Sequence, residues 1–252
     1  MGGGSTMPRF FVENDSIFSD KIVIGGEDAK HISLSLRARV GEKLTACDGK
    51  GTDYECEIAE ITKNEVTLSV LEQKKSSAEP TVEVVLYQAL VKSDKFDFIV
   101  QKCTELGVSR IVPVLCDRCI SKPDDSSLSK KLVRWNKIAK EAAMQSGRGV
   151  IPEVSDAVSF DGALEEIKGA DCGFVCYETD PHEPINEIFS CHKDAKTVAF
   201  LIGPEGGIAD REAEKTRGSC VHLASLGPRI LRTETAPLCV MSAVMLVTGN
   251  MN

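Results

Sequence analysis

The N-terminal part of the chain carries short runs in which apolar and polar residues alternate, and turn sequences separate these runs. Residues 22–24, 44–47 and 66–70 are such runs. Alternation with a period of two predicts strands that bury one face. Only residues 28–37 have helical spacing, so the segment from residue 10 to residue 70 is predicted to form a small β-barrel.

A polar stretch at residues 72–79 that ends at Pro80 is interpreted as a linker, and the pattern changes after it. Apolar runs of strand length now alternate with segments of helical spacing. The predicted strands cover residues 82–89, 110–115, 172–177, 197–202 and 221–223. The predicted helices cover residues 93–106, 129–146, a short segment near 185, 210–217 and 237–247. This alternation predicts an α/β domain with a mostly parallel sheet, in which ligands bind beyond the carboxyl ends of the strands.

These patterns predict two domains, residues 7–73 and residues 80–252. Residues 1–6 lack the basic and apolar regions of a signal peptide and are interpreted as an added leader before Met7. The composition, 42% hydrophobic and 27% charged, is that of a globular protein. The longest apolar stretch, residues 238–247, is shorter than the roughly 18 to 20 residues that cross a bilayer, so no contact with a membrane is predicted.

The 10 cysteines occur without an export signal, which indicates a reducing compartment and predicts a cytoplasmic location. Cys116 and Cys119 have the CxxC spacing of redox and zinc sites. A zinc site needs further ligands, and His182, His192 and His222 show no metal spacing. The two cysteines are therefore predicted to be ordinary buried thiols at a strand end, and no metal site is predicted.

The formal net charge of −8 argues against a protein that coats nucleic acid nonspecifically, because such binding neutralises many phosphates. The charge is unevenly distributed. Between residues 92 and 148 there are twelve Lys and Arg residues and seven Asp and Glu residues, a local net charge of +5. A positive segment on a negative protein suits a polyanion bound at one defined place, although a solvated protein face has the same pattern.

The sequence Gly203-Pro204-Glu205-Gly206-Gly207 directly follows an apolar predicted strand. Three glycines around a rigid proline let the backbone approach a ligand where a Cβ atom would collide. The motifs GxxxxGK[ST] and GxGxxG are both absent, so neither a P-loop nor a dinucleotide fingerprint is present. A tight strand-to-helix turn is the alternative interpretation.

Residues 225–237 follow the next predicted strand and are too rich in apolar and charged residues for a plain turn. Such local inconsistency is typical of functional sites. Ile230 and Leu231 can sandwich a flat apolar ring, and Arg232 offers a cation. Thr235 and Pro237 fit the start of the last helix. We interpret this segment as a second ligand-binding loop.

On these motifs the chain resembles the RsmE family of small-subunit ribosomal RNA uracil-N3 methyltransferases, which belong to the SPOUT superfamily. The resemblance spans nearly everything from Met7. The motifs that carry it are Pro8-Arg9-Phe10-Phe11, Asp48-Gly49-Lys50-Gly51, Glu105-Leu106-Gly107-Val108, Gln145-Ser146-Gly147-Arg148, residues 201–207 and residues 225–236. The cysteines at 116 and 119 and the proline at 237 depart from the family pattern.

The resemblance implies an N-terminal PUA-like β-barrel that binds RNA and a C-terminal SPOUT-type α/β domain with a deep trefoil knot. It also implies a homodimer that meets through the final helix and the knot region. The implied cofactor is S-adenosyl-L-methionine, bent in the knot, and no metal is required. The implied cofactor-binding residues are Leu201, Ile202, Gly203, Pro204, Glu205, Gly206, Gly207, Leu226, Gly227, Ile230, Leu231, Arg232, Thr235 and Ala236.

The activity implied by the resemblance is methylation of N3 of a specific uridine in 16S ribosomal RNA, within the small ribosomal subunit. Arg232 is predicted to stabilise the anionic uracil, and Glu234 or a water molecule is predicted to accept the N3 proton. The predicted RNA contacts are Arg9, Arg37 and Lys50 in the barrel, with Gln145 and Arg148 near the base.

Two other functions remain open at this point. One is methylation of another RNA, either transfer RNA or a ribose 2'-hydroxyl. The other is a noncatalytic RNA-binding factor for ribosome assembly that keeps the fold and has lost the reaction.

Overall fold

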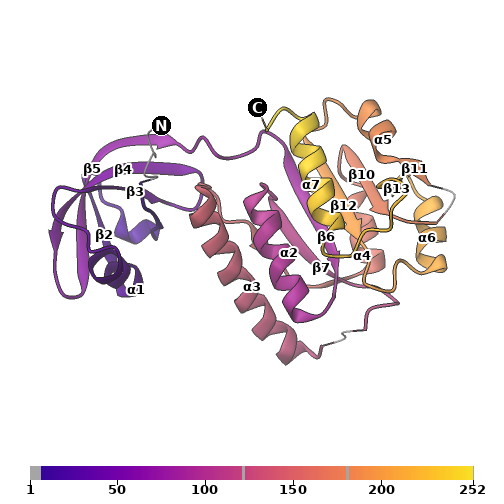
Figure 1. Cartoon of the computed structure of the whole chain (residues 1–252), viewed down its shortest axis with the longest axis horizontal. Coiled ribbons are helices and arrows are strands. Elements are labelled where there is room, and N and C mark those ends of the chain that lie inside the picture. Colours follow the sequence, from indigo (N-terminus) through magenta and orange to yellow (C-terminus); the bar gives the residue numbers. More distant parts are fainter. Residues whose placement is uncertain (1–6, 121–122, 180–181, 252) are drawn as a thin grey trace. The chain divides into compact units, whose positions relative to one another are not determined.

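The computed structural model describes residues 7–120, 123–179 and 182–251, so the predicted leader lies outside the described residues. The chain forms two compact units, shown in Figure 1. The first unit extends to Glu79 and also contains Ala143–Ile151, and the second contains Pro80–Ala142 and the residues from Pro152 onward. The division after Glu79 falls at the end of the predicted linker. Residues 143–151 group with the first unit, although the predicted boundary assigned them to the second.

The first unit is built on a small curled five-stranded sheet with the strand order β1-β3-β4-β5-β2. Its strands are β1 (Arg9–Phe11), β2 (Lys21–Gly25), β3 (Lys43–Cys47), β4 (Thr52–Ile61) and β5 (Glu65–Lys75). Strands β1 and β3 are parallel and the other pairs are antiparallel. The helical segments are the short η1 (Asn14–Ser16), α1 (Gly26–Lys30) and the π-helical turn η2 (His31–Ser35).

Three strands of this sheet differ from the sequence prediction. Strands β1 and β4 were not predicted, and β5 continues to Lys75 into the predicted linker. The last residues of β5 are exposed on both faces and carry no apolar alternation. They are held by the ladder with β4, in which Thr52 pairs with Lys75. Pairing with a neighbouring strand therefore extends β5 beyond its hydrophobic pattern.

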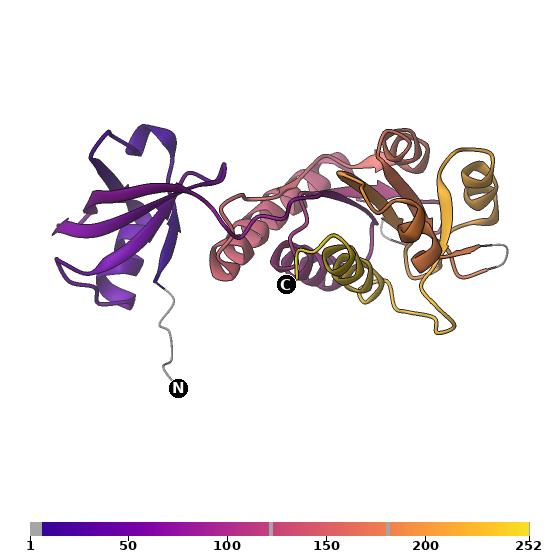
Figure 2. The same ribbon diagram turned by 90° about the horizontal axis from the view of Figure 1, so that it is seen from above.

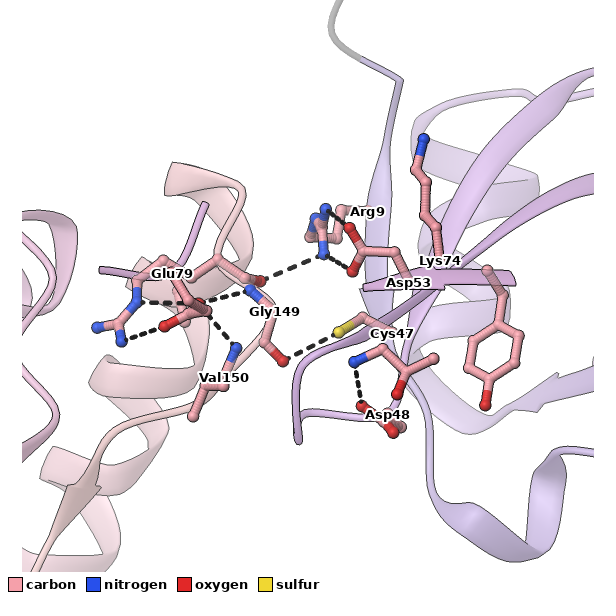
Figure 3. A network of polar contacts seen from close by, with 12 residues as sticks. Arg9, Cys47, Asp48, Asp53, Lys74, Glu79, Gly149 and Val150 are labelled. Carbon is pink, nitrogen blue, oxygen red and sulfur yellow. Dashed lines mark hydrogen bonds and ion pairs between the residues drawn. The ribbon is translucent and has the colours of Figure 1, made fainter. Parts of the chain in front are cut away.

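A polar network attaches residues 148–150 to the rest of the first unit, as Figure 3 shows. One carboxylate oxygen of Glu79 accepts hydrogen bonds from the amides of Gly149 and Val150 at 2.8 and 3.0 Å. The other oxygen accepts from the guanidinium of Arg148 at 2.7 Å. The Arg9 guanidinium binds the Asp53 carboxylate at 2.6 and 2.7 Å and donates to the Arg148 carbonyl at 3.3 Å. These contacts explain why the segment belongs to the first unit.

The second unit is a parallel sheet with the strand order β11-β13-β10-β12-β6-β7-β8, and β9 pairs with β7. Its strands are β6 (Glu83–Ala89), β7 (Arg110–Leu115), β8 (Glu153–Val154), β9 (Val158–Ser159), β10 (Cys172–Cys176), β11 (Glu183–Pro184), β12 (Thr197–Ile202) and β13 (His222–Ser225). All of the pairings are parallel. The predicted parallel sheet is confirmed.

The helices of the second unit are α2 (Ser93–Glu105), α3 (Asp125–Ser146), α4 (Phe160–Ile167), α5 (Ile185–Cys191), α6 (Asp210–Arg217) and α7 (Ala236–Val247). The last residues of α3 count with the first unit. Helix α7 packs beside α2, as both views show (Figures 1 and 2). The short elements α4, β8, β9 and β11 were not predicted. No helix in the described part of the chain is long and apolar enough to span a membrane.

The order of the strands determines where a ligand can bind. Strand β7 pairs with one side of β6, and β12 pairs with the other side. In open α/β sheets, ligands bind outside the carboxyl ends of the strands at such a point. Both Gly-Pro sequences follow strands that end at this edge. The fold therefore brings the two predicted loops to one site.

Candidate functional site

A cavity of about 440 Å³ lies where β10, β12 and β13 end. We call residues 203–207 the first loop and residues 226–235 the second loop. The predicted cofactor residues that line the cavity are Ile202, Gly203, Pro204, Glu205, Gly207, Leu226, Gly227, Ile230, Leu231, Arg232 and Ala236. Leu201 is instead buried in β12, and Gly206 and Thr235 lie outside the lining. The contacts of these residues with a cofactor stay predictions.

The backbone of the first loop needs glycine at position 207. Gly207 has a φ of +71°, in the left-handed region that favours glycine, and its amide donates to the Pro204 carbonyl at 2.9 Å. A Cβ atom at this position would lie 2.5 Å from a carboxylate oxygen of Glu178. The loop therefore turns tightly against Glu178, another residue of the cavity.

Side chains from α6 and from the segment after β7 hold the first loop in place. The buried carboxylate of Glu212 accepts hydrogen bonds from the amides of Asp117 and Ala209, both at 2.9 Å. The guanidinium of Arg118 donates to the carbonyls of Gly206 and Ile208 at 3.2 and 3.1 Å. Charge-assisted bonds of this kind hold a fixed geometry. The wall of the cavity is thus formed before a ligand arrives.

Thr233 connects the second loop to the first loop and to β6. Its hydroxyl donates to the Gly203 carbonyl at 2.7 Å and accepts from the side-chain amide of Gln88 at 3.2 Å. Gln88 is fully buried at the end of β6, and Thr233 is 8% exposed. The two loops and β6 are therefore joined by one buried hydroxyl.

Replacing Thr233 with valine is expected to lower the free energy of unfolding of the second unit by about 1–3 kcal/mol, because two buried groups lose a partner. Valine keeps the shape of the side chain and removes only the hydroxyl. Urea unfolding followed by the fluorescence of Trp135, which is the 1 tryptophan of the chain and is buried in this unit, measures the change.

Thr248→Val is the matched control for Thr233→Val. The Thr248 hydroxyl donates to the Val244 carbonyl within the last turn of α7 at 2.7 Å, away from the cavity lining. Loss of the Thr248 hydroxyl is expected to lower the free energy of unfolding less than loss of the Thr233 hydroxyl does. Equal stability of the Thr233→Val variant and the unmodified protein would show that this hydroxyl does not connect the loops.

A chain of charged contacts joins four side chains beside the cavity, and three of them, Lys95, Glu205 and Arg232, line it. The ammonium of Lys95 lies 3.3 Å from a carboxylate oxygen of Glu205 and 3.4 Å from one of Glu234. Burial acts to lower the pKa of Lys95, but the hydrogen bonds and charges of these two glutamates outweigh it and raise that pKa. The guanidinium of Arg232 is 83% exposed and approaches the other oxygen of Glu234 at 3.9 Å. Arg232 is therefore accessible to a second substrate, whereas Glu234 is partly enclosed.

Comparison with known proteins identifies the chain. A family model described as an RNA methyltransferase domain matches residues 77–245, and one described as an RNA methyltransferase PUA domain matches residues 24–71. Ribosomal RNA small subunit methyltransferase E of Bacillus subtilis (strain 168) is 34% identical over 96% of this chain and 97% of its own length. The chain belongs to this methyltransferase E family. The resemblance inferred from the motifs is confirmed.

Two solved structures match the methyltransferase E fold of this chain along nearly its whole length. The small subunit methyltransferase E from Neisseria gonorrhoeae, bound to S-adenosyl methionine, is 29% identical with a TM-score of 0.86 and covers 96% of this chain and 98% of its own. A putative methyltransferase from Legionella pneumophila, in complex with the same cofactor, is 28% identical with a TM-score of 0.84. It covers 95% of this chain and 97% of its own. The predicted combination of a PUA-like unit and an α/β methyltransferase unit is confirmed.

Sequence reasoning about this methyltransferase missed several residues that line the cavity, among them Lys95, Tyr177, Glu178 and Ile208. Tyr177 and Glu178 directly follow β10, so the rule that ligands bind at the carboxyl ends of strands points to them. Lys95 lies in the first turn of α2. No local signal distinguishes it from the other lysines of this basic segment.

The predicted RNA contacts of the methyltransferase fall into two groups. Arg37, Lys50 and Gln145 are exposed. The guanidinium of Arg9 is engaged by Asp53, and that of Arg148 is buried against Glu79. Contacts of Arg9 and Arg148 with RNA stay predictions, and they would compete with these ion pairs.

Cys116 and Cys119 are both buried immediately after β7, where the amide of Cys116 donates to the Cys119 sulfur at 3.3 Å. They form no disulfide. Among the residues that the structure describes, no group of three or more His, Cys, Asp and Glu side chains could hold a metal ion. The prediction of buried thiols at a strand end is confirmed.

Proposed function

We propose that this chain transfers the methyl group of S-adenosyl-L-methionine to N3 of a uridine in 16S ribosomal RNA. Its membership of the methyltransferase E family makes it an RNA methyltransferase that uses this cofactor. The observation that carries the proposal is the cavity formed by the two loops, with the exposed Arg232 among its lining residues.

The residues of the cavity fit S-adenosylmethionine. Ile202, Leu226 and Leu231 offer apolar surface to an adenine ring, and the close turn at Gly207 leaves backbone groups free to approach it. Glu178 and Glu205 bring carboxylates into the lining, which suits a ligand with a positively charged sulfonium. When bound, the cofactor supplies a methyl group on that sulfonium.

The residues around the cavity can orient the uracil and manage its charge. Transfer to N3 is an in-line displacement, so the protein contributes mainly by holding the base against the methyl group. The exposed guanidinium of Arg232 can stabilise the negative charge that develops on the uracil carbonyl oxygens. Glu234, or a water molecule beside it, can accept the N3 proton.

We also propose that the second loop closes a trefoil knot. It leaves β13 and reaches back to the first loop and to the end of β6, where Thr233 binds the Gly203 carbonyl and the Gln88 amide. It then enters α7, which packs beside α2. This path across the carboxyl ends of β12 and β6 is the one that the family resemblance implies, and it supports the knot.

The small ribosomal subunit is proposed as the substrate and a homodimer as the working form. Leu246 and Val247 at the end of α7 are 65% and 54% exposed, which supports a protein interface on this helix. A cytoplasmic location is proposed because all 10 cysteines are free, as expected in a reducing compartment.

The target is identified by incubating small subunits that lack the modification with radiolabelled S-adenosylmethionine, followed by nucleoside analysis. N3-methyluridine is the expected product. Naked 16S ribosomal RNA and transfer RNA, tested in parallel, show which substrate the enzyme requires. A 2'-O-methylated nucleoside or labelled transfer RNA would replace the proposed target. Cofactor binding without transfer to any RNA would indicate the noncatalytic assembly factor.

A further inference from the structure

Lys95 stands between two acidic side chains that come from the two different loops of the cavity. Its ammonium lies 3.3 Å from the carboxylate of Glu205 in the first loop and 3.4 Å from that of Glu234 in the second loop. Lys95 itself belongs to α2, which follows β6. One cation on a helix therefore contacts both loops of the cavity.

The three side chains are enclosed more than ordinary surface charges. The exposed fractions are 27% for Lys95, 23% for Glu205 and 19% for Glu234. The Glu234 oxygen that faces Lys95 is shielded from solvent. Charges in such an environment are screened less than exposed pairs. Without the ammonium, two partly enclosed carboxylates would repel each other across the cavity.

No other cation among the described residues pairs with both Glu205 and Glu234. The Arg232 guanidinium lies 3.9 Å from the opposite oxygen of Glu234 and is 83% exposed, and no ion pair between Arg232 and Glu205 occurs in the described residues. The hydroxyl of Thr233 joins the backbones of the two loops on their buried side. Lys95 joins their side chains at the cavity.

We propose that Lys95 is a positioning residue that holds the first and second loops together through Glu205 and Glu234 and so shapes the cofactor cavity. This inference rests on the proposed function only for the identity of the cofactor. It assigns Lys95 no contact with the uracil.

A purely electrostatic role for Lys95 would have a different signature from a positioning role. S-adenosylmethionine carries a sulfonium charge that its product, S-adenosylhomocysteine, lacks. If Lys95 acted only through its charge, removing it would favour the sulfonium compound over the product. If Lys95 positions the loops, removing it lowers the affinity for both compounds by the same factor.

The test is calorimetric binding of both compounds to the full-length protein. Lys95→Met is expected to lower the affinity for each about tenfold, whereas Lys95→Arg, which keeps the cation, should stay within about threefold of the unmodified protein. Lys102→Met is the matched control, because Lys102 lies on the same helix and pairs with Glu105 away from the cavity lining. It should leave both affinities unchanged.

A double-mutant cycle isolates the bridge. In a protein that carries Glu205→Gln and Glu234→Gln, adding Lys95→Met should cost little further affinity, because its partners are already neutral. Unchanged affinities in Lys95→Met, or a loss confined to one of the two compounds, would overturn the proposal. The proposal would also be overturned if Lys95→Met lowered the affinity of the Glu205→Gln/Glu234→Gln protein as much as it lowers that of the unmodified protein.

The thermal unfolding midpoint of each cofactor-free variant shows whether it is folded. If Lys95→Met does not fold, the Lys95→Arg variant and the Glu205→Gln/Glu234→Gln protein carry the test. The latter should lose affinity for S-adenosylhomocysteine, which has no sulfonium charge for Glu205 to attract. Binding of S-adenosylmethionine is measured without RNA. A wrong RNA target would therefore leave this result standing, whereas an unmodified protein that binds neither compound would refute the cofactor assignment itself.

Discussion

Replacing Arg232 with alanine is expected to slow methyl transfer by about 100-fold to 1000-fold, as expected when a group that stabilises developing charge is removed. The affinity for S-adenosylmethionine should change by less than about threefold, because the guanidinium of Arg232 is 83% exposed and is proposed to act on the uracil. Single-turnover transfer to unmodified small subunits measures the rate, and calorimetry measures the affinity.

Arg134→Ala provides the control for this experiment. Arg134 is 65% exposed on α3, pairs with Asp97 and does not line the cavity. The Arg134→Ala substitution changes the net charge by the same amount as Arg232→Ala and should leave the rate of methyl transfer unchanged. Transfer at close to the native rate by the Arg232→Ala variant would remove this residue from the mechanism and leave positioning as the main contribution of the protein.

Replacing Glu79 with alanine is expected to destabilise the first unit by about 3–5 kcal/mol, the usual cost of breaking a buried ion pair by removing one partner. The change leaves the buried Arg148 guanidinium without its carboxylate and removes the acceptor of the Gly149 and Val150 amides. Residues 148–150 should then separate more readily from the sheet. Urea unfolding followed by far-ultraviolet circular dichroism measures the loss.

Glu60→Ala is the matched control, since Glu60 is an exposed glutamate on β4 of the same unit. It should change the stability by less than about 0.5 kcal/mol, as is usual for a surface substitution. The fluorescence of Trp135 reports on the second unit and separates the two transitions. A Glu79→Ala variant as stable as the Glu60→Ala variant would show that the network in Figure 3 contributes little.

The fate of Arg148 shows why a motif can mark an important residue and still leave its role open. The sequence Gln145-Ser146-Gly147-Arg148 supported the family resemblance, from which an RNA contact was predicted. The structure places the guanidinium at 3% exposure against Glu79. Burial depends on a partner far away along the chain, and a motif contains no information about that partner.

Strand β5 shows a limit of hydrophobic patterns. Its first half alternates and was predicted, but its last residues are polar on both faces and were interpreted as a linker. They are in the strand because β4 supplies backbone partners. Periodicity records which side chains are buried and does not record which amides and carbonyls find a partner.

The sequence by itself determined the α/β alternation of the second unit, the β-rich first unit and the two loops, because periodicity and the Gly-Pro sequences are local properties. It also determined the family, through motifs spread over the whole chain. Only the tertiary structure decided that Lys95 lies between Glu205 and Glu234, that Thr233 reaches Gln88, and which of the arginines predicted to contact RNA are already paired. Ion pairs and buried hydrogen bonds depend on distances of a few ångströms between residues far apart in sequence, and only the folded chain sets those distances.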